Sequence, residues 1–461
     1  MSPDTARFDP DLIRRYDVLG PRYTSYPTAN LFSPDFPPNA FRDALLRLAE
    51  KPHAPLSLYV HVPFCATVCY YCACNRIITN NRRHAVEYLE RLDREIAMVR
   101  SLLPRTHEVE QLHFGGGTPT YLNDRQLEAL FTSLGERFNL SAGEGRDFSI
   151  EIDPRTVDAA RIRFLTGLGI NRLSLGVQDF DPDVQRAVNR IQSVEATAAV
   201  IEAARAAGVK SVSIDLIYGL PLQTPERFAR TLATVQALAP DRISLYSYAH
   251  MPDRFKTQRQ INVTDLPQAE TKLRLLELAV ETLCAHDYRY IGMDHFARHG
   301  DSLVKAQQDG ALQRNFQGYT THRHCDLIGL GVSGISQVGG VFAQNAKALE
   351  RYYEIVDSGA LPVERGLVSS AEDRLRRDVI AALMCHFRVD MREVGVRHEI
   401  DFRRHFAAEL ERLRALEADG LVRIDSDAIE VTPRGRFLIR NVAMVFDAYL
   451  TARSAGFSRA I

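Results

Sequence analysis

The sequence predicts an α/β protein: a partial (β/α)6 barrel with an N-terminal arm and a mainly helical, winged-helix-like C-terminal domain. Three observations support this prediction. Strand-like apolar runs alternate with helical stretches, about six such units are present, and the pattern changes to amphipathic helices near residue 371. Alternation of this kind is typical of a parallel sheet. Six units fall short of the eight that close a complete barrel.

These patterns divide the chain into an arm (1–38), a central domain (39–353) and a C-terminal domain (354–461). The arm is rich in Pro, Tyr, Asp and Arg, and it has little helical or strand periodicity. We therefore expect it to serve function more than stability.

The central domain contains the six predicted strands, each separated from the next by a helical stretch. The strand candidates are 57–62, 109–114, 147–152, 172–177, 211–218 and 242–248, and the helix candidates are 84–102, 124–138, 156–168, 194–207 and 225–238.

The C-terminal domain has three amphipathic helical stretches, and a short predicted hairpin lies between the last two. The stretches are 371–387, 400–420 and 432–450, and the hairpin is 421–432. Helices around a hairpin resemble a winged helix, a fold that often binds DNA. The second stretch carries acids as well as arginines, however, and the whole chain has a net charge of −1. We therefore expect no nucleic-acid partner.

Composition is that of a large soluble enzyme. The 461 residues are 45% hydrophobic and 25% charged, which is enough for two or three domains with sizeable cores. No apolar run reaches the ~18 residues of a membrane span. The N-terminal sequence lacks the apolar stretch of a signal peptide, so we expect a cytoplasmic protein whose thiols stay reduced.

Four cysteines, Cys65, Cys69, Cys72 and Cys74, lie within ten residues directly after the first predicted strand, whereas the other three are isolated. So dense a group in a reducing compartment indicates a metal site more than disulfides. Structural zinc needs a second ligand pair, and the sequence offers none. The Cys-x3-Cys-x2-Cys group suits three irons of a [4Fe–4S] cluster and leaves one iron open for a small molecule. We interpret Cys74 as a nearby thiol without a ligand role.

Polar residues and glycines follow each predicted strand at its carboxyl end, which is where β/α folds bind ligands. Gly115, Gly116, Gly117 and Thr118 follow the second strand, Glu151 and Asp153 end the third, Gln178 and Asp179 follow the fourth, Asp215 and Tyr218 end the fifth, and Tyr248, Ala249 and His250 end the sixth. Singly, the acids suit helix caps or surface positions equally well. Their shared edge favours one active site.

Several motifs together resemble the oxygen-independent coproporphyrinogen III oxidases of the radical S-adenosylmethionine (SAM) superfamily. They include YVHVPFCATVCYYCACN, QLHFGGGTPTYL, SIEIDP, RLSLGVQDF, IDLIYGLPLQT, YIGMDHFA and NFQGYTT. The three-cysteine spacing is common to the superfamily. The additional Cys74, the arm motif RYTSYPTA and GMDHF narrow the resemblance to this family.

The resemblance implies that 39–353 is a radical SAM catalytic domain acting in heme biosynthesis. Two propionates of coproporphyrinogen III each lose a hydrogen atom, an electron and carbon dioxide, and become the vinyl groups of protoporphyrinogen IX. A 5′-deoxyadenosyl radical starts each reaction. The alternative is a related heme-binding chaperone that keeps the cluster but does not decarboxylate.

The resemblance also implies a [4Fe–4S] cluster held by Cys65, Cys69 and Cys72, and two SAM molecules. Contacts to the cluster-bound SAM carry over to Tyr59, Gly116, Glu151 and Ile335. Contacts to the second SAM carry over to Tyr71, Gly117, Thr118, Gln178, Arg190, Asp215 and Ala249. Tyr71 is often phenylalanine in the family, and either ring can stack on an adenine. From residue type alone, Arg190 also suits a solvated position.

Substrate recognition needs partners for four carboxylates, because an unpaired buried charge costs several kcal/mol. Arg22 in the arm and Gln317 in NFQGYTT are the candidates, and anchoring of loops is the competing interpretation for both. We further expect a low-potential electron donor as partner, and a monomer.

Overall fold

The computed structural model describes residues 8–450. Its contacts divide the chain into two units. We call Phe32–Gln268 with His324–Val368 the sheet unit, and the described part of 1–31, Ala269–Arg323 and 369–450 the helical unit. The predicted arm thus begins outside the described residues, and the proposed three-part division of the chain stays a prediction.

The sheet unit is built on parallel strands in the order β9–β8–β7–β6–β4–β1–β14, which antiparallel strands continue in the order β15–β16–β17. All six predicted strands are present. The parallel strands are β1 (Leu56–Val62), β4 (Glu108–Gly116), β6 (Asp147–Ile152), β7 (Arg172–Gln178), β8 (Ser211–Tyr218), β9 (Arg242–Ser247) and β14 (Asp326–Leu330); the antiparallel ones are β15 (Ile335–Val338), β16 (Val341–Asn345) and β17 (Val363–Val368). Shorter strands are β2 (Phe64–Cys65), β3 (Ile77–Ile78) and β5 (Asn139–Leu140).

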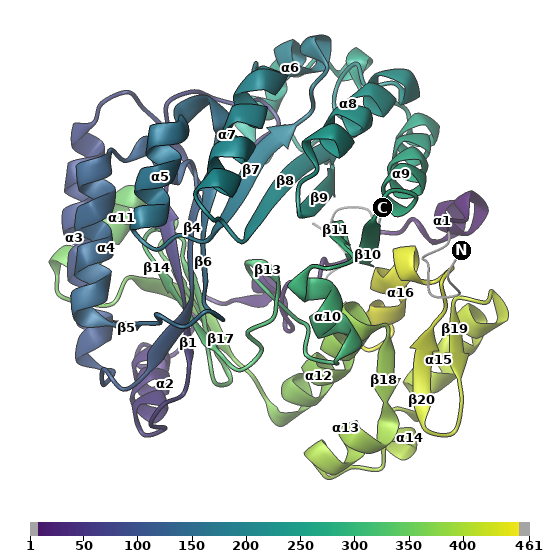
Figure 1. The fold of residues 1–461 in the computed structure, drawn as a ribbon. Helices are drawn as coiled ribbons and strands as arrows, with labels where there is room; N and C mark the ends of the chain where they lie inside the picture. The colour runs from purple at the N-terminus through teal and green to yellow at the C-terminus, as the bar shows by residue number, and fades with distance from the viewer. Residues whose placement is uncertain (1–7, 451–461) are drawn as a thin grey trace. The chain divides into compact units, whose positions relative to one another are not determined.

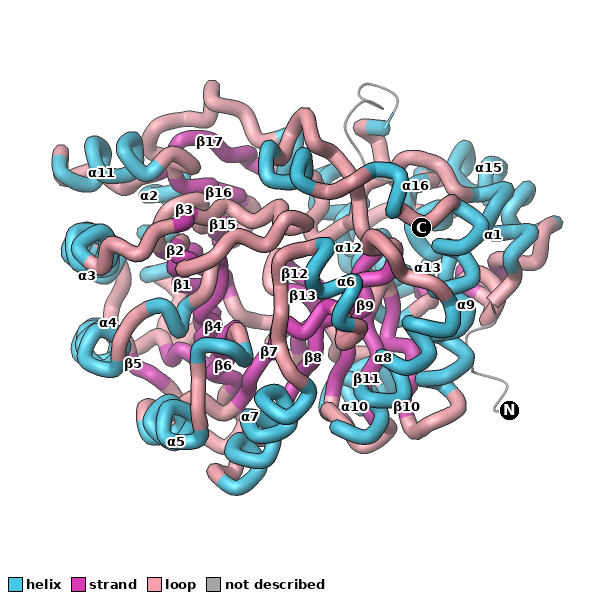
Figure 2. The backbone as a smooth tube through the Cα atoms, turned by 90° about the horizontal axis from the view of Figure 1, so that it is seen from above, coloured by secondary structure: helices cyan, strands magenta, loops and turns pink. Residues whose placement is uncertain are grey.

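Helices connect consecutive parallel strands, as the sequence predicted, and Figure 2 shows α3, α4, α5 and α7 outside the arc of strands. The helices of this unit are α2 (Ala40–Ala49), α3 (Arg83–Ser101), α4 (Asp124–Arg137), α5 (Ala159–Gly167), α6 (Pro182–Ala187), α7 (Val194–Ala206), α8 (Pro225–Leu238) and α11 (Leu349–Asp357). The partial (β/α)6 barrel is therefore confirmed.

Local sequence fixes where these elements begin. Asn123 accepts from the backbone N–H of Gln126, whose side chain bonds back to Asn123, so α4 starts with a capping box. Thr224 caps α8 and Pro225 occupies its first turn. Strand β7 alternates half-buried and buried residues, which orients successive side chains toward opposite faces of the sheet.

The helical unit contains residues 8–31 of the arm, the segment 269–323 and residues 369–450 of the C-terminal domain (Figure 1). Its helices are α1 (Pro10–Tyr16), α9 (Ala269–Cys284), α10 (Ser302–Gln308), α12 (Ala371–His386), α13 (Met391–His398), α14 (Phe402–His405), α15 (Ala407–Ala418) and α16 (Ile439–Met444). Its strands are β10 (Tyr288–Gly292), β11 (His295–Arg298), β12 (Gln313–Asn315), β13 (Gly318–Thr320), β18 (Arg388–Asp390), β19 (Val422–Ile424) and β20 (Ala428–Val431).

The predicted hairpin is β19–β20, and β18 joins it to give the order β18–β20–β19. Along the chain, α12 precedes β18, and α13 and α15 lie between β18 and the β19–β20 hairpin, which is the order of elements in a winged helix. No helix in the described range 8–450 combines the length and the apolarity needed to cross a membrane.

The expectation that the arm serves function more than stability stays a prediction, and within the helical unit side chains anchor the described part of the arm. Tyr23 and Tyr26 are buried in the helical unit, and the Tyr23 hydroxyl donates to Asp447 at 2.9 Å. Arg440 donates through Nε to the carbonyl of Pro21 at 2.9 Å. The arm includes α1, which the sequence did not predict; beyond α1, single aromatic side chains anchor the arm, and a periodicity search does not detect such anchors.

Candidate active site

The four clustered cysteines lie on one loop that follows β1. Cys65 ends β2, which pairs in parallel with β3 through Cys65 and Ile78. The backbone N–H of Tyr70 donates to Val188 at 3.0 Å, and the Asn189 side chain donates to the carbonyl of Val68 at 2.7 Å. These bonds fix the loop against the chain that follows α6.

Cationic side chains surround the loop. Arg190 donates to the Cys69 sulfur at 3.5 Å, and Arg155 lies 4.0 Å from the same sulfur. Both guanidinium groups pair with Asp153, at 3.2 Å and 2.7 Å. Arg76 donates to the carbonyls of Cys72 and Cys74. Burial alone would raise the pKa of Asp153, but the hydrogen bond and charge of Arg155 and the charge of Arg190 lower it.

The thiols differ in how readily they lose a proton. A hydrogen bond from the Cys74 thiol, helped by Arg76, lowers the pKa of Cys72 to about 6. The same bond raises the pKa of Cys74 well above its usual range. Burial raises the pKa of Cys65 to about 11, although the Thr118 hydroxyl lies 3.5 Å from its sulfur. Cys74 therefore stabilises a neighbouring thiolate while keeping its own proton.

Glu151 and the glycines after β4 form a second group. The N–H of Gly116 donates to Glu151 at 3.2 Å, and His113 lies 3.4 Å from the same carboxylate. Gly116 has a φ of +115°, and a Cβ there would lie 2.6 Å from the His61 ring. A Cβ on Gly117 would lie 2.7 Å from the Pro63 backbone. Close packing of this strand end against the cysteine loop therefore requires both glycines.

Tyr59 and Ile335 lie on strands near this group. The Tyr59 ring stacks on His113 with centroids 5.8 Å apart, and its hydroxyl is 3.1 Å from Nδ1 of His61. Ile335 begins β15, where it pairs with Gln344 of β16.

A third group contains Gln178, Arg190 and Asp215. Burial raises the pKa of Asp215 to about 6, and the carboxylate accepts from Ser174 at 3.3 Å. Gln178 has a φ of +71° at an irregularity in the pairing of β7 with β8. Arg190 donates through Nε to the carbonyl of Gly176 at 3.1 Å. Its guanidinium thus already has backbone, carboxylate and sulfur partners within the protein.

Tyr71 and Ala249 are joined by one side chain. The amide nitrogen of Gln258 donates to the carbonyl of Tyr71 at 3.1 Å and to that of Ala249 at 3.2 Å. The Tyr71 hydroxyl bonds to Cys69, and burial raises the pKa of Tyr71 well above its usual range.

The two substrate candidates belong to the helical unit. Arg22 forms an ion pair with Asp294, within the GMDHF motif. Gln317 lies in the turn between β12 and β13, and within the described residues neither polar atom of its side-chain amide has a hydrogen-bond partner. A buried amide without partners costs free energy, which is consistent with a ligand contact.

Two family models match the chain: the radical SAM superfamily over residues 59–235, and the HemN C-terminal domain over residues 369–438. The oxygen-independent coproporphyrinogen III oxidase of Pseudomonas aeruginosa is 52% identical over 459 residues, 99% of this chain and 100% of the relative. The enzyme of that name from Escherichia coli K12 is 48% identical over 463 residues, covering both chains completely.

The chain belongs to the oxygen-independent coproporphyrinogen III oxidases. The solved structure of coproporphyrinogen III oxidase (HemN) from Escherichia coli, a radical SAM enzyme, matches with a TM-score of 0.92 and 47% identity. The match covers 97% of this chain and 100% of that one. The family expected from the sequence motifs is thereby confirmed.

Membership of the radical SAM superfamily implies a [4Fe–4S] cluster and SAM, and the cysteine loop of this oxidase fits such a cluster. Its cysteines are free thiols. Because iron binds thiolates, a cluster must displace their protons, and the nearby arginines offset the negative charge that results. Three guanidinium groups, those of Arg76, Arg155 and Arg190, are within reach of the loop.

The sequence did not indicate Arg76, Arg155 or Gln258 as parts of this site. Arg76 and Arg155 each lie two residues beyond a recognised feature, Cys74 and Asp153, and chain proximity was the sole signal available. Gln258 lies in a 3-10 helix, Lys256–Gln260, and it reaches Tyr71 across 187 positions of sequence. Sequence periodicity contains no information about such a contact.

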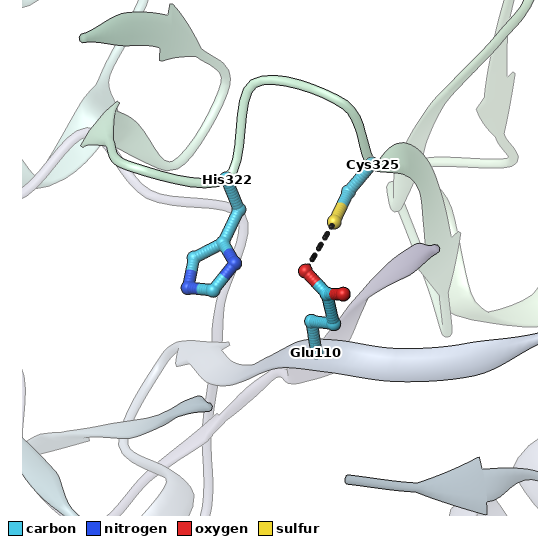
Figure 3. A group of neighbouring side chains, drawn as sticks. All are labelled: Glu110, His322 and Cys325. Carbon is cyan, nitrogen blue, oxygen red and sulfur yellow. Dashed lines mark hydrogen bonds between the residues drawn. The ribbon is translucent and has the colours of Figure 1, made fainter. Parts of the chain in front are cut away.

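The isolated cysteines have different surroundings. Cys325 precedes β14 and donates to a carboxylate oxygen of Glu110 at 3.9 Å, as Figure 3 shows. Burial, with Glu110 and Asp326, raises the pKa of Cys325 to about 12. Burial also raises the pKa of Cys284 to about 11 and that of Cys385 to about 12. These thiols stay protonated.

Proposed function

We propose that this chain decarboxylates two propionates of coproporphyrinogen III to the vinyl groups of protoporphyrinogen IX, without oxygen, in heme biosynthesis. The observation that carries the proposal is that the chain belongs to the oxidase family over its whole length. When bound, the cluster and SAM supply a 5′-deoxyadenosyl radical that removes a hydrogen atom from a propionate. The residues around them bind, orient and exclude water.

In this proposal Cys65, Cys69 and Cys72 hold the cluster. The positive charges of Arg155 and Arg190 offset the negative charge of the cluster and its thiolates, since both guanidinium groups donate toward the Cys69 sulfur. Cys74 is a donor to Cys72 and no ligand. Hydrogen bonds to cluster sulfurs raise the reduction potential, because they favour the more negative reduced state.

For the cluster-bound SAM we propose contacts from Tyr59, Gly116, Glu151 and Ile335. The Glu151 carboxylate is 43% exposed and therefore open to a ligand. One of its oxygens accepts from the N–H of Gly116 and the other lies 3.4 Å from His113, so the carboxylate is held in one orientation, and its exposed side can meet a ribose hydroxyl or the sulfonium charge.

We propose that a second SAM contacts Tyr71, Gly117, Thr118, Gln178, Arg190, Asp215 and Ala249. The bridge from Gln258 to Tyr71 and Ala249 supports this proposal, because it holds two of the expected contacts together. Arg190 pairs with Asp153 and the Cys69 sulfur. If Arg190 also binds the methionine carboxylate of the second SAM, it links that SAM to the cysteine loop.

For substrate carboxylates we propose Arg22 and Gln317. Gln317 is supported by its unsatisfied amide. Arg22 must break or weaken its ion pair with Asp294 before it can bind a substrate carboxylate. Its contribution to binding is therefore smaller than that of an arginine without a carboxylate partner. We further propose a monomer in the cytoplasm that takes electrons from a low-potential donor.

Anaerobic turnover tests the function. Reconstituted protein, given SAM, a reductant and coproporphyrinogen III, is expected to form protoporphyrinogen IX and methionine. Protein that purifies with tightly bound heme and forms no methionine with coproporphyrinogen III would instead support the chaperone alternative.

A further inference from the structure

The side-chain amide of Gln258 makes all of its bonds within the protein. Gln258 lies in the 3-10 helix Lys256–Gln260 and is 1% exposed. Its nitrogen donates to the carbonyls of Tyr71 and Ala249, and its oxygen accepts from the backbone N–H of Met251 at 2.6 Å. Only Asn and Gln carry an amide with two N–H donors and an acceptor, and Asn is one methylene shorter. The site therefore requires glutamine both for its chemistry and for its length.

The two carbonyls that Gln258 binds belong to different segments. Tyr71 directly precedes Cys72 in the cysteine loop, whereas Ala249 lies two residues beyond the end of β9. Because Gln258 is buried, water cannot replace its bonds, and loss of the amide would leave both carbonyls without this donor. One side chain thus fixes the separation between the loop and the carboxyl end of β9.

The neighbouring residue, Thr257, holds the cysteine loop at a second point. Its hydroxyl accepts from Arg76 at 3.0 Å. Arg76 also donates to the carbonyl of Cys72 at 2.9 Å and to that of Cys74 at 3.2 Å. The 3-10 helix therefore contacts the loop on both sides of Cys72, directly at Tyr71 and through Arg76.

The first half of the loop is held by other residues. Segment 188–190 makes these bonds: Val188 accepts from the N–H of Tyr70, Asn189 donates to Val68, and Arg190 donates to the Cys69 sulfur. None of these bonds involves the 3-10 helix. A change at Gln258 should therefore disturb the second half of the loop and leave the first half in place.

We propose that Gln258 is a positioning residue for the second SAM, and that it acts by holding the backbone at Tyr71 and Ala249 at a fixed separation. The inference rests on the proposed function and deepens it, since Tyr71 and Ala249 are the proposed contacts that Gln258 joins. A ligand that binds between two segments already held in place loses less free energy in ordering them. The second SAM site should therefore depend on Gln258 more strongly than the cluster-bound one.

The test measures SAM binding to the cluster-loaded protein by equilibrium dialysis with labelled SAM. Gln258→Glu keeps the size of the side chain and replaces its NH2 with an oxygen, so at least one carbonyl loses its donor. The second SAM should bind roughly ten- to a hundredfold more weakly, the range for an unsatisfied buried partner, while the first SAM is unaffected. Thr257→Val removes the bond to Arg76 alone, and a smaller loss is expected.

The matched control is Gln260→Glu, the same substitution at an exposed position of the same 3-10 helix. It should leave both SAM affinities unchanged. Iron and sulfide content and the thermal unfolding midpoint are measured for each variant, because a purely structural role would lower these quantities and both SAM affinities together. If Gln258→Glu does not fold, Gln258→Asn, which keeps the amide and shortens its reach, gives the same comparison.

Unchanged affinity for the second SAM in Gln258→Glu overturns the inference, and so does an equal loss at both SAM sites. A wild-type chain that binds a single SAM with substrate present also overturns it, while decarboxylation by that chain is still measured separately. A wild-type chain that binds two SAM molecules but forms no protoporphyrinogen IX rejects the proposed function, and selective loss of the second SAM in Gln258→Glu would still support the positioning role.

Discussion

Cys72 and Cys325 are both partly buried, yet their neighbours act on them in opposite directions. Around Cys72, the Cys74 thiol and Arg76 lower the pKa to about 6 despite burial. Around Cys325, Glu110 and Asp326 add to burial and raise the pKa to about 12. Burial disfavours a thiolate in both places, so donors and cations decide where one forms.

The difference also has a structural origin. The cysteine loop follows the carboxyl end of β1, where loops from several strands bring arginines together. Cys325 and Glu110 lie near the amino ends of β14 and β4 (Figure 3). In β/α folds the carboxyl ends are the functional edge, and the amino ends serve stability. The same residue type thus has a different role at each edge.

Serine substitutions should separate the two groups of cysteines most strongly. Cys65→Ser, Cys69→Ser or Cys72→Ser is expected to abolish the cluster, because a hydroxyl is a poor replacement for an iron-bound thiolate. Cys74→Ser and the matched control Cys325→Ser should keep it. Iron and sulfide content with anaerobic electron paramagnetic resonance measures the result. A cluster that is lost in Cys74→Ser and kept in Cys72→Ser contradicts the ligand assignment.

Carboxylate substitutions at the same edge should affect cofactor binding without removing the cluster. Glu151→Gln and Asp215→Asn are each expected to weaken one SAM site roughly ten- to a hundredfold, the range for a lost bond to a charged group. Equilibrium dialysis with labelled SAM should show two molecules in wild type and about one in Asp215→Asn. Glu195→Gln, an exposed position on α7, is the control.

Asp215 also predicts a pH dependence. Burial raises its pKa to about 6, so the carboxylate is charged above that pH and protonated below it. Binding of a sulfonium cofactor at the second site should therefore weaken as the pH falls through about 6, and Asp215→Asn should remove this dependence. A single SAM per wild-type chain, with substrate present, rejects the second site.

Much of this edge could be predicted from sequence. Six of the seven parallel strands were predicted because their apolar runs are continuous or alternate, and the chain order of such runs determines which loops share an edge; the seventh, β14, was not predicted. The Arg155 and Arg190 contacts to Cys69 could not be predicted, since they join positions 86 and 121 residues apart. The three-residue strand β18 was missed because so short a run shows no periodicity.

Burial and hydrogen-bond donors also act in opposite directions on the pKa of a buried carboxylate, Glu95. Glu95 is buried on α3 and accepts from Gly331, Asn345 and Tyr352 at 2.6–2.7 Å. Burial raises its pKa to about 7 from an ordinary value of 4.5, although the three donors act to lower it. Because the folded state binds the proton more tightly, this group's contribution to stability falls as pH rises from 4.5 to about 7, then stays level.

Glu95→Gln should lower the free energy of unfolding by about 1–3 kcal/mol, because its amide NH2 must face a donor. It should also remove the pH dependence between pH 5 and 7. Urea unfolding at several pH values measures both effects. Glu90→Gln, exposed on the same helix, should change neither, and equal stability of the two variants would contradict a structural role for the buried network.

The smallest expected effect concerns Cys325 itself. Glu110→Gln removes a charge that raises the pKa of Cys325 but leaves its burial unchanged, so the pKa should fall while staying above the usual range. More thiolate then forms near pH 9, and alkylation of Cys325 by iodoacetamide, followed by peptide mass spectrometry, should quicken roughly two- to fivefold. Glu108→Gln removes an exposed charge two residues away on the same strand and should leave the rate unchanged. Equal rates in both variants would show that burial alone keeps Cys325 protonated, and the contrast with Cys72 would then depend on the cations of the cysteine loop.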